Sequence, residues 1–265
     1  MSLSLLSRRS LWLPLATASL ALLASPTPAH ATPSTVYWAP STPAVQGAGV
    51  LHLTYDTYFA SSGLYPVDVG ATIGVLPWQG LQLELGADLL YPTSDGEDGL
   101  SVPVYFNGKL GAPQDVYFPG QPAWSAGIYN VGLESDVTDY DVVYGVLGYT
   151  FERLGSVAAG GYYGMSDTLL VDRDGEEARA GVLASYTSPA IHVPLLDKLV
   201  VAADLQTGQN ALGAGGAGLA LYFTPAIALV TGPVFFLEPE VQPGASDWMW
   251  TAQLDVDLDL TSKTP

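Results

Sequence analysis

Acidic side chains share one face of several apolar segments, and they are the residues best suited to carry chemistry. In residues 253–260, Gln-Leu-Asp-Val-Asp-Leu-Asp-Leu, three aspartates alternate with aliphatic residues. In a β-strand, such acids all point to one side. Acidic side chains that line a pore favour cations and repel anions. The acids that this alternation places on one face are Asp56, Asp68, Glu84, Asp88, Asp204, Asp255, Asp257 and Asp259.

The rest of this face is built largely from glycine and neutral polar residues. The neutral partners expected for the acids are Asn107, Gln206 and Gln253, and the basic members of the face are Lys109 and Arg179. We expect the two basic residues to pair with some of the acids rather than to form an anion filter. The pattern therefore predicts a lumen with a negative potential that selects for cations.

Histidine chemistry is the main alternative. A membrane-embedded hydrolase needs a histidine base beside a serine or an acid. His192 lies in a proline-flanked connection, and His52 shares the face of Thr54 and Asp56 near one end of its segment. We interpret His52 as one polar lumen residue among many and predict no enzyme.

A glycine-rich motif, Gly-Ala-Gly-Gly-Ala-Gly at 213–218, formally matches the dinucleotide fingerprint. That fingerprint must lie between a strand and a helix, with the pyrophosphate at the helix N-terminus. Here Leu-Ala-Leu-Tyr-Phe follows, which continues a strand pattern. We therefore expect a small-residue strand that leaves room for inward side chains.

Acidic loops at 93–99 and 171–177 offer oxygen ligands for calcium. An EF-hand loop requires glycine at its sixth position and glutamate at its twelfth. Counted from Asp172, these positions hold Glu177 and Leu183, so the motif fails. The chain also has no cysteine. We predict no metal site and no cofactor.

The elements that must position these side chains are twelve segments of strand character. The length of each segment is close to the roughly 9 to 11 residues that a tilted membrane strand needs. They are residues 50–60, 67–76, 81–91, 101–110, 124–134, 140–151, 156–166, 178–187, 199–208, 212–223, 226–237 and 248–260.

The composition favours a membrane barrel. Only 13% of the residues are charged and 48% are hydrophobic, yet no apolar run beyond the N-terminus is long enough for a membrane helix. This predicts an all-β, antiparallel up-and-down transmembrane barrel of about 12 strands, within about 10 to 14. A soluble β-sandwich is the alternative, but its polar face usually carries more lysine and glutamate. The net charge of −18 argues against nucleic acid.

The connections support an up-and-down barrel. Those at 77–80, 152–155 and 224–226 are tight, and we expect them on the periplasmic side. Longer acidic connections at 169–177 and 238–246 are expected outside, with the loop at 92–99. Aromatic residues near segment ends predict interfacial girdles. They are Tyr55, Phe59, Trp78, Tyr91, Trp124, Tyr149, Phe151, Phe223, Trp248 and Trp250.

The N-terminus has the pattern of an export signal. Arg8 and Arg9 precede an apolar stretch, and Ala-His-Ala ends at Ala31 as a small-residue cleavage site. A single N-terminal membrane anchor is the alternative. We predict a signal peptide at 1–31, an extended periplasmic lead-in at 32–48 and one barrel domain at 49–265.

Several stretches also resemble a known group of proteins. They are VPVYFNGKLGAPQ, AGIYNVG, YGVLGYTFERLGSVAAGGYYG, LVVAADLQTGQNALGAGGAGLALYFTP and WTAQLDVDL. These resemble an uncharacterised family of Gram-negative outer-membrane β-barrel proteins, over about residues 67 to 260. The resemblance implies fold and location, and it brings no assigned functional residues. One departure is the C-terminus, which runs on to Thr-Ser-Lys-Thr-Pro instead of ending on an aromatic residue.

The sequence thus predicts a porin-like outer-membrane barrel that passes small solutes and favours cations. A closed barrel with a structural or interaction role is the second interpretation, and a barrel-embedded hydrolase is the third. The expected partners are outer-membrane lipid, lipopolysaccharide, the barrel-assembly machinery and small solutes.

Overall fold

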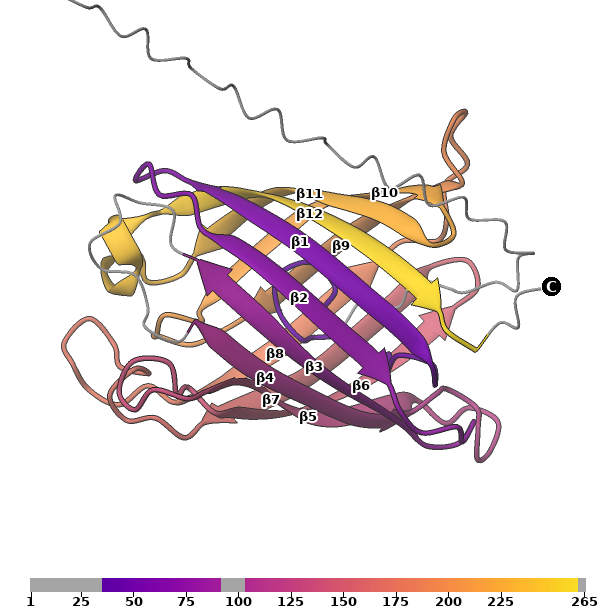
Figure 1. The fold of residues 1–265 in the computed structure, drawn as a ribbon, viewed down its shortest axis with the longest axis horizontal. Helices are drawn as coiled ribbons and strands as arrows, with labels where there is room; N and C mark the ends of the chain where they lie inside the picture. Colours follow the sequence, from indigo (N-terminus) through magenta and orange to yellow (C-terminus); the bar gives the residue numbers. More distant parts are fainter. Residues whose placement is uncertain (1–34, 92–102, 262–265) are drawn as a thin grey trace, which may run out of the picture.

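The computed structural model describes residues 35–91 and 103–261 and contains twelve β-strands (Figure 1). Each strand matches one predicted segment, with ends shifted by a few residues at most. The strands are β1 (Val50–Ala60), β2 (Val67–Gly74), β3 (Gln82–Tyr91), β4 (Val104–Ala112), β5 (Ala123–Gly132), β6 (Val142–Phe151), β7 (Gly155–Gly164), β8 (Ala180–Thr187), β9 (Lys198–Gln206), β10 (Ala214–Thr224), β11 (Ile227–Phe236) and β12 (Trp248–Asp259). Two short 3-10 helices, η1 (Pro239–Val241) and η2 (Pro243–Ala245), precede β12. Among the described residues, no helix is long and apolar enough to cross a bilayer.

The twelve strands close into one antiparallel barrel. Each strand pairs with its sequence neighbours, and β1 pairs with β12 from Val50 opposite Asp259 to Ala60 opposite Met249. Closure gives every strand a hydrogen-bonded neighbour on both sides, as a sheet surrounded by lipid requires. The predicted up-and-down barrel of twelve strands is confirmed.

Inner and outer faces alternate along the strands. On β12, Asp255 and Asp257 are buried, whereas Trp250 and Leu254 are 45% and 41% exposed. Large apolar side chains also point outward elsewhere, as Leu147 on β6 does. The acids of the terminal strand therefore face the interior and its apolar residues face outward, because successive side chains of a strand point to opposite faces.

The two ends of the barrel carry different connections. At one end, which we call the turn end, β2–β3, β6–β7 and β10–β11 are joined by 75–81, 152–154 and 225–226. At the other, which we call the loop end, β7–β8 and β11–β12 are joined by 165–179 and 237–247. These connections show the predicted alternation, but 113–122 and 188–197 at the turn end are longer than 61–66 and 207–213 at the loop end. Which end faces the periplasm stays a prediction.

The predicted interfacial aromatics lie near the strand ends, with one exception. Near the loop end are Phe59, Tyr91, Trp248 and Trp250. Near the turn end are Trp78, Trp124, Tyr149, Phe151 and Phe223. Tyr55 instead lies in the middle of β1, with its side chain 50% exposed. The role of these rings at a membrane interface stays a prediction.

Residues 35–48 run through the interior of the barrel before β1 begins, and we call them the lumenal segment (Figure 1). Tyr37 and Ser41 are fully buried, and Gln46 is 2% exposed. The sequence predicted that residues 32–48 form a lead-in outside the barrel. For the described part, the structure corrects this location, because the segment fills the lumen and its backbone groups bind the polar inner wall. The predicted signal peptide, the loop at 92–99 and residues 262–265 lie outside the described residues.

Candidate functional site in the barrel lumen

Asp204 of β9 is the main anchor of the lumenal segment. Its Oδ2 accepts hydrogen bonds from the backbone N–H groups of Tyr37, Trp38 and Ala39 at 3.0, 2.9 and 2.9 Å. The hydroxyl of Ser41 donates to the same oxygen at 3.2 Å. Hydrogen bonds to a charged acceptor are about twice as strong as those between neutral groups. The sequence placed Asp204 on the lumen wall, and the structure shows that it binds the protein's own chain.

A second anchor lies near the turn end. The backbone N–H of Gln46 donates to Glu84 Oε2 at 2.7 Å, and its side-chain amide donates to Asp257 Oδ1 at 3.2 Å. Lys109 Nζ lies 3.2 Å from Glu84 Oε1 and donates to the carbonyl of Ala44 at 2.9 Å. Lys109 thus pairs with an acid, as the sequence indicated, and this buried ion pair also binds the lumenal segment.

Other strands hold the middle of the segment. Ser185 Oγ donates to the carbonyl of Ser41 at 2.8 Å, and Gln253 Nε2 donates to the carbonyl of Tyr37 at 2.8 Å. The Tyr37 hydroxyl donates to the carbonyl of Pro233 at 3.1 Å. Strands β3, β4, β8, β9, β11 and β12 therefore all contribute side-chain or backbone contacts to the segment.

The glycines of the 213–218 motif make room for Tyr37. A Cβ atom on Gly216 would lie 2.6 Å from a carbon of the Tyr37 ring, and one on Gly218 would lie 2.5 Å from another. Both distances are too short for any side chain. The prediction of a small-residue strand that accommodates an inward side chain is confirmed, and β10 continues through the motif as a strand.

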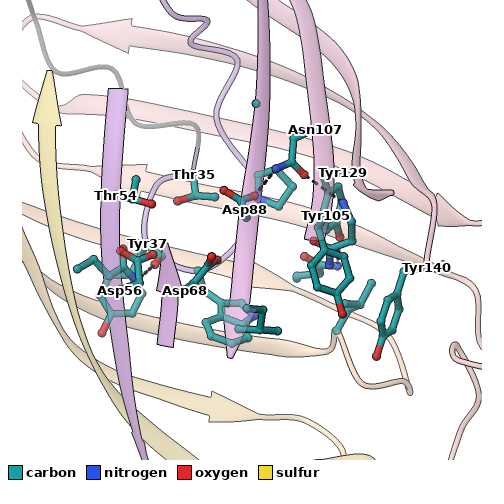
Figure 2. Close-up of a pocket in the computed structure, with 18 of the residues that line it drawn as sticks. Thr35, Tyr37, Thr54, Asp56, Asp68, Asp88, Tyr105, Asn107, Tyr129 and Tyr140 are labelled. Carbon is teal, nitrogen blue, oxygen red and sulfur yellow. Dashed lines mark hydrogen bonds between the residues drawn. The ribbon is translucent and has the colours of Figure 1, made fainter. Parts of the chain in front are cut away.

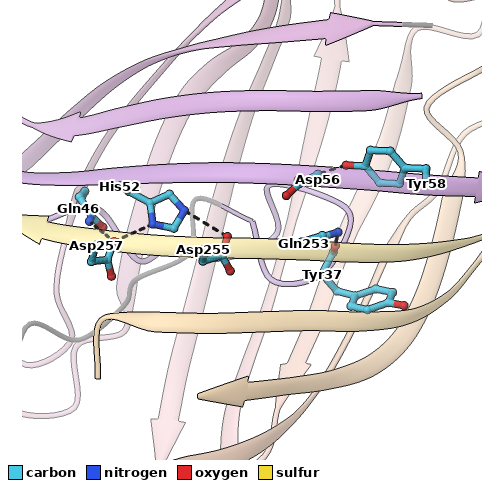
Figure 3. A network of polar contacts seen from close by, with 8 residues as sticks. All are labelled: Tyr37, Gln46, His52, Asp56, Tyr58, Gln253, Asp255 and Asp257. Atoms are coloured by element: carbon cyan, nitrogen blue, oxygen red, sulfur yellow. Dashed lines mark hydrogen bonds and ion pairs between the residues drawn. The ribbon is translucent and has the colours of Figure 1, made fainter. Parts of the chain in front are cut away.

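His52 lies between two aspartates of the neighbouring strand (Figure 3). Its Nδ1 is 2.7 Å from Asp257 Oδ1 and its Nε2 is 3.6 Å from Asp255 Oδ1. His52 is directly opposite Asp257 in the β1–β12 register and is 3% exposed. Both ring nitrogens thus face carboxylates rather than a serine hydroxyl. This arrangement fits a polar wall residue and offers no activated serine nucleophile.

A cavity of about 650 Å³ remains beside the lumenal segment. Its wall comes mainly from β1 to β5, and Val36, Tyr37 and Trp38 of the lumenal segment close one side. Volumes of about 300 to 1,000 Å³ are typical of small-molecule sites. The interior is thus divided between the protein's own chain and a space large enough for a small molecule.

Three acids of adjacent strands line this cavity (Figure 2). Asp56 of β1 is directly opposite Asp68 of β2. Asp88 of β3 is opposite Gly70, where a Cβ atom would lie 2.3 Å from Asp88 Oδ1 and 2.7 Å from Thr54 Oγ1. Gly70 therefore lets the Asp88 carboxylate lie across β2, close to the other two acids.

The remaining predicted lumen residues have separate contacts. Asn107 donates to Asp88, and its Oδ1 accepts the backbone N–H of Asn130 at 3.1 Å. Gln206 donates to the Tyr129 hydroxyl at 2.7 Å. Asp259 ends β12 at the barrel mouth and accepts two hydrogen bonds from Thr261. Asn107 thus belongs to the cavity wall, whereas Asp259 lies at the rim.

Arg179 does not line the cavity, so its predicted lumen position is corrected. It precedes the first residue of β8, and its guanidinium pairs with Glu177. The same group lies 5.7 Å from the centroid of Tyr163, whose side chain is 48% exposed. Arg179 lies at the loop end just before β8 begins, and its contact with Glu177, rather than the strand alternation, sets the direction of its side chain.

The loop at 171–177 is a small acidic hairpin. Asp172 Oδ1 accepts the backbone N–H groups of Asp174 and Glu176, both at 2.9 Å. An isolated bridge joins Val171 to Glu177. The loop acids thus serve the turn itself, and the part of the chain that the structure describes contains no cluster of three or more ligands able to hold a metal.

Sequence reasoning missed the residues of the lumenal segment, above all Tyr37, Ser41 and Gln46. The stretch Thr-Pro-Ser-Thr-Val-Tyr-Trp-Ala-Pro has neither strand nor helix periodicity, and its prolines favour an extended chain. Its lack of any charged residue between Thr32 and Asp56 is the one signal compatible with a buried position.

No protein-family model matches the chain, and no curated protein matches it. Among solved structures, the NanC porin covers 78% of this chain and 98% of its own, with a TM-score of 0.49 and 11% identity. An outer membrane channel from Pseudomonas putida F1 covers 89% of this chain and 100% of its own, with a TM-score of 0.46 and 12% identity. A Rhodopseudomonas blastica porin triple mutant covers 79% and 99%, with a TM-score of 0.39 and 9% identity. At such low identities and TM-scores, this similarity does not indicate which solute, if any, passes through this barrel.

Proposed function

We propose that this protein is a porin-like outer-membrane conduit for small solutes that favours cations and opens when the lumenal segment leaves the barrel. The observation that carries this proposal is the closed barrel itself, with apolar side chains outside and acids inside. Leu254 is 41% exposed whereas its neighbour Asp255 is 9% exposed. A closed barrel with such faces suits lipid around a polar lumen.

The chemistry of the lumen supports cation preference. The cavity wall carries Asp56, Asp68 and Asp88, and Lys109, which also lines the cavity, is paired with Glu84. Acidic rings attract cations, and a low-dielectric wall strengthens their field. The cationic side chain is thus matched by an acid, while acids of the cavity are left to act on passing ions.

The lumenal segment supports a gate. Its contacts with the wall are hydrogen bonds, one shared ion pair and the packing of Val36, Tyr37 and Trp38 against apolar side chains of the wall. The polar contacts exchange with water once the segment leaves the lumen, whereas the apolar packing is lost. Each hydrogen bond contributes about 0.5–1.5 kcal/mol net, or about 1.5–3 kcal/mol where one partner is charged. Such a set can hold the segment in place and still release it without unfolding the barrel.

The same segment favours a second candidate function, a permanently closed barrel with a structural or interaction role. Tyr37, Ser41 and Gln46 lie inside the lumen and are almost fully buried, so the segment occupies part of any path through the barrel. The two candidates differ in one property, which is whether the barrel ever conducts ions.

Planar-bilayer recording of the purified full chain tests the proposal. Under a roughly tenfold KCl gradient, we expect a reversal potential of the sign that marks cation current. Raising the salt should weaken the preference, since the Debye length falls from about 10 Å at 0.1 M to about 3 Å at 1 M. An anion-selective current would contradict the acidic lumen, and the absence of any conductance would favour the closed barrel.

Cleavage of a signal peptide after Ala31, contact with lipopolysaccharide and insertion by the barrel-assembly machinery belong to the same proposal. So does the absence of enzyme activity, which His52 supports because both its nitrogens face Asp255 and Asp257.

A further inference from the structure

We propose that the lumenal cavity is a binding site for a small primary amine with an apolar body. Its ammonium group would lie among Asp56, Asp68 and Asp88, and its body against Trp38, Tyr105 and Tyr140. This inference rests on the proposed function in one respect, because the bound amine would be the solute that the conduit admits.

No ion pair between described residues supplies a counter-charge to these three carboxylates. The ion pairs of the described residues involve His52, Lys109, Arg173 and Arg179, and none of them includes Asp56, Asp68 or Asp88. Asp56 and Asp68 are directly opposite each other in the β1–β2 register. Like charges in this position destabilise a sheet. A ligand cation would relieve this repulsion.

Unsatisfied oxygens provide a second, independent observation. Oδ1 of Asp56 and Oδ1 of Asp68 are buried and have no hydrogen-bond partner among the described residues. The other oxygen of Asp56 accepts the Tyr58 hydroxyl at 3.3 Å (Figure 3). Buried carboxylate oxygens are costly without donors. An ammonium group brings three donors, so it can supply what both acids lack.

Asp204 and Asp257 provide the contrast. Each also has one buried oxygen without a partner. However, the other oxygen of Asp204 accepts four hydrogen bonds, and that of Asp257 lies 2.7 Å from His52 Nδ1. These two acids therefore have their charge offset within the protein, which the cavity acids do not.

The rest of the cavity selects an organic cation over a metal ion. The described residues contain no group of three or more ligands placed to hold a metal. Tyr105, Tyr140, Trp38, Leu90, Phe236 and Met249 are among the residues that line the cavity. Figure 2 shows Tyr105 and Tyr140 across the space from Asp56 and Asp68. Aromatic rings attract cations and pack against apolar groups.

Isothermal titration calorimetry on the folded full chain in detergent micelles tests this inference. The probes are 2-phenylethylamine, its neutral analogue 2-phenylethanol and the anion 3-phenylpropanoate, each also titrated into empty micelles. We expect saturable binding of the amine alone. The double variant Asp56→Asn/Asp68→Asn should weaken it by at least about tenfold, because charged hydrogen bonds are lost.

Glu240→Gln is the matched control, because it removes an exposed acid at the same end of the barrel. It should leave the amine affinity unchanged. Equal binding of the amine and the alcohol, no binding of the amine, or equal affinity in the double variant would each overturn the inference.

Conductance measured on the same preparation separates the two proposals. A protein that binds the amine but never conducts would contradict the conduit and retain the binding site. A protein that conducts cations but does not bind the amine would retain the conduit and contradict the binding site.

Discussion

The lumen contains two kinds of acid, and they differ in what surrounds them. Glu84, Asp204 and Asp257 contact the lumenal segment, and each also has a cationic group or several N–H donors beside it. Asp56 and Asp68 face the cavity and have no cationic partner among the described residues. One set of acids therefore holds the protein's own chain, while the other is free to act on solutes.

The largest expected effect comes from the anchor of the lumenal segment. Asp204→Ala removes the acceptor of four hydrogen bonds, three of them from backbone N–H groups of residues 37–39. Because hydrogen bonds to a charged group contribute about 1.5–3 kcal/mol each, we expect the open probability in planar bilayers to rise by more than about tenfold. Asp197→Ala, an exposed acid at the turn end, is the control and should behave like the wild type. Unchanged gating in Asp204→Ala would refute the anchor.

The next effect concerns the buried ion pair. Lys109→Met leaves Glu84 buried without its cation, and breaking such a pair costs about 3–5 kcal/mol. We expect the free energy of unfolding, measured by urea titration in lipid vesicles, to fall by about this amount. Adding Glu84→Gln should restore most of the loss, since both charges are then gone. If Lys109→Met left the free energy of unfolding unchanged, the buried Glu84 would not depend on Lys109.

A smaller effect is expected for Asp257→Asn. Asp257 contacts His52 and Gln46, so its neutralisation removes a charged hydrogen bond, with a loss of about 1.5–3 kcal/mol in the same urea titration. From the sequence alone, this residue would be one of three equivalent acids of β12, and its removal would hardly matter. If the variant and the wild type were equally stable, Asp257 would not differ from the other acids of β12.

The smallest effect, and one of opposite sign, is expected for Asp56→Asn. It relieves the repulsion from Asp68 directly across the strand pair. Cross-strand pairs contribute roughly 0.2–1 kcal/mol, so the barrel should gain stability in about this range. A clear loss of stability would mean that Asp56 has a cationic partner after all, and the contrast between the two sets of acids would then disappear.

The sequence was sufficient for the barrel and for the faces of its strands. A period of two residues specifies which side chains share a face, so the inward position of Asp255 and Asp257 followed from their spacing alone. Long and short connections in alternation then predicted the up-and-down order. Both signals lie in neighbouring residues of the sequence, so they predict the fold without any knowledge of long-range contacts.

The lumenal segment could not be predicted in the same way. The contacts of Tyr37, Trp38 and Ala39 with Asp204 join residues separated by 165 to 167 positions. The donors are backbone N–H groups, which every residue but proline has, so the side-chain pattern carries no signal for them. The predicted position of Arg179 was wrong for a related reason. Its side chain is directed by a loop contact with Glu177 rather than by the strand period.

If the lumenal segment closes a conduit that favours cations, a reversible disulfide between the segment and the barrel wall should control the current. Pro43 of the lumenal segment is a direct neighbour of Gly148 on β6, where a Cβ atom would lie 2.8 Å from Pro43 Cγ, so Pro43→Cys and Gly148→Cys would bring two thiols together in a chain without cysteine. Its conductance would be recorded in planar bilayers under a roughly tenfold KCl gradient, first oxidised and then after adding a reductant. We predict no current when the bridge is formed and a cation-favouring current once it is reduced. The same current in both states would contradict the claim.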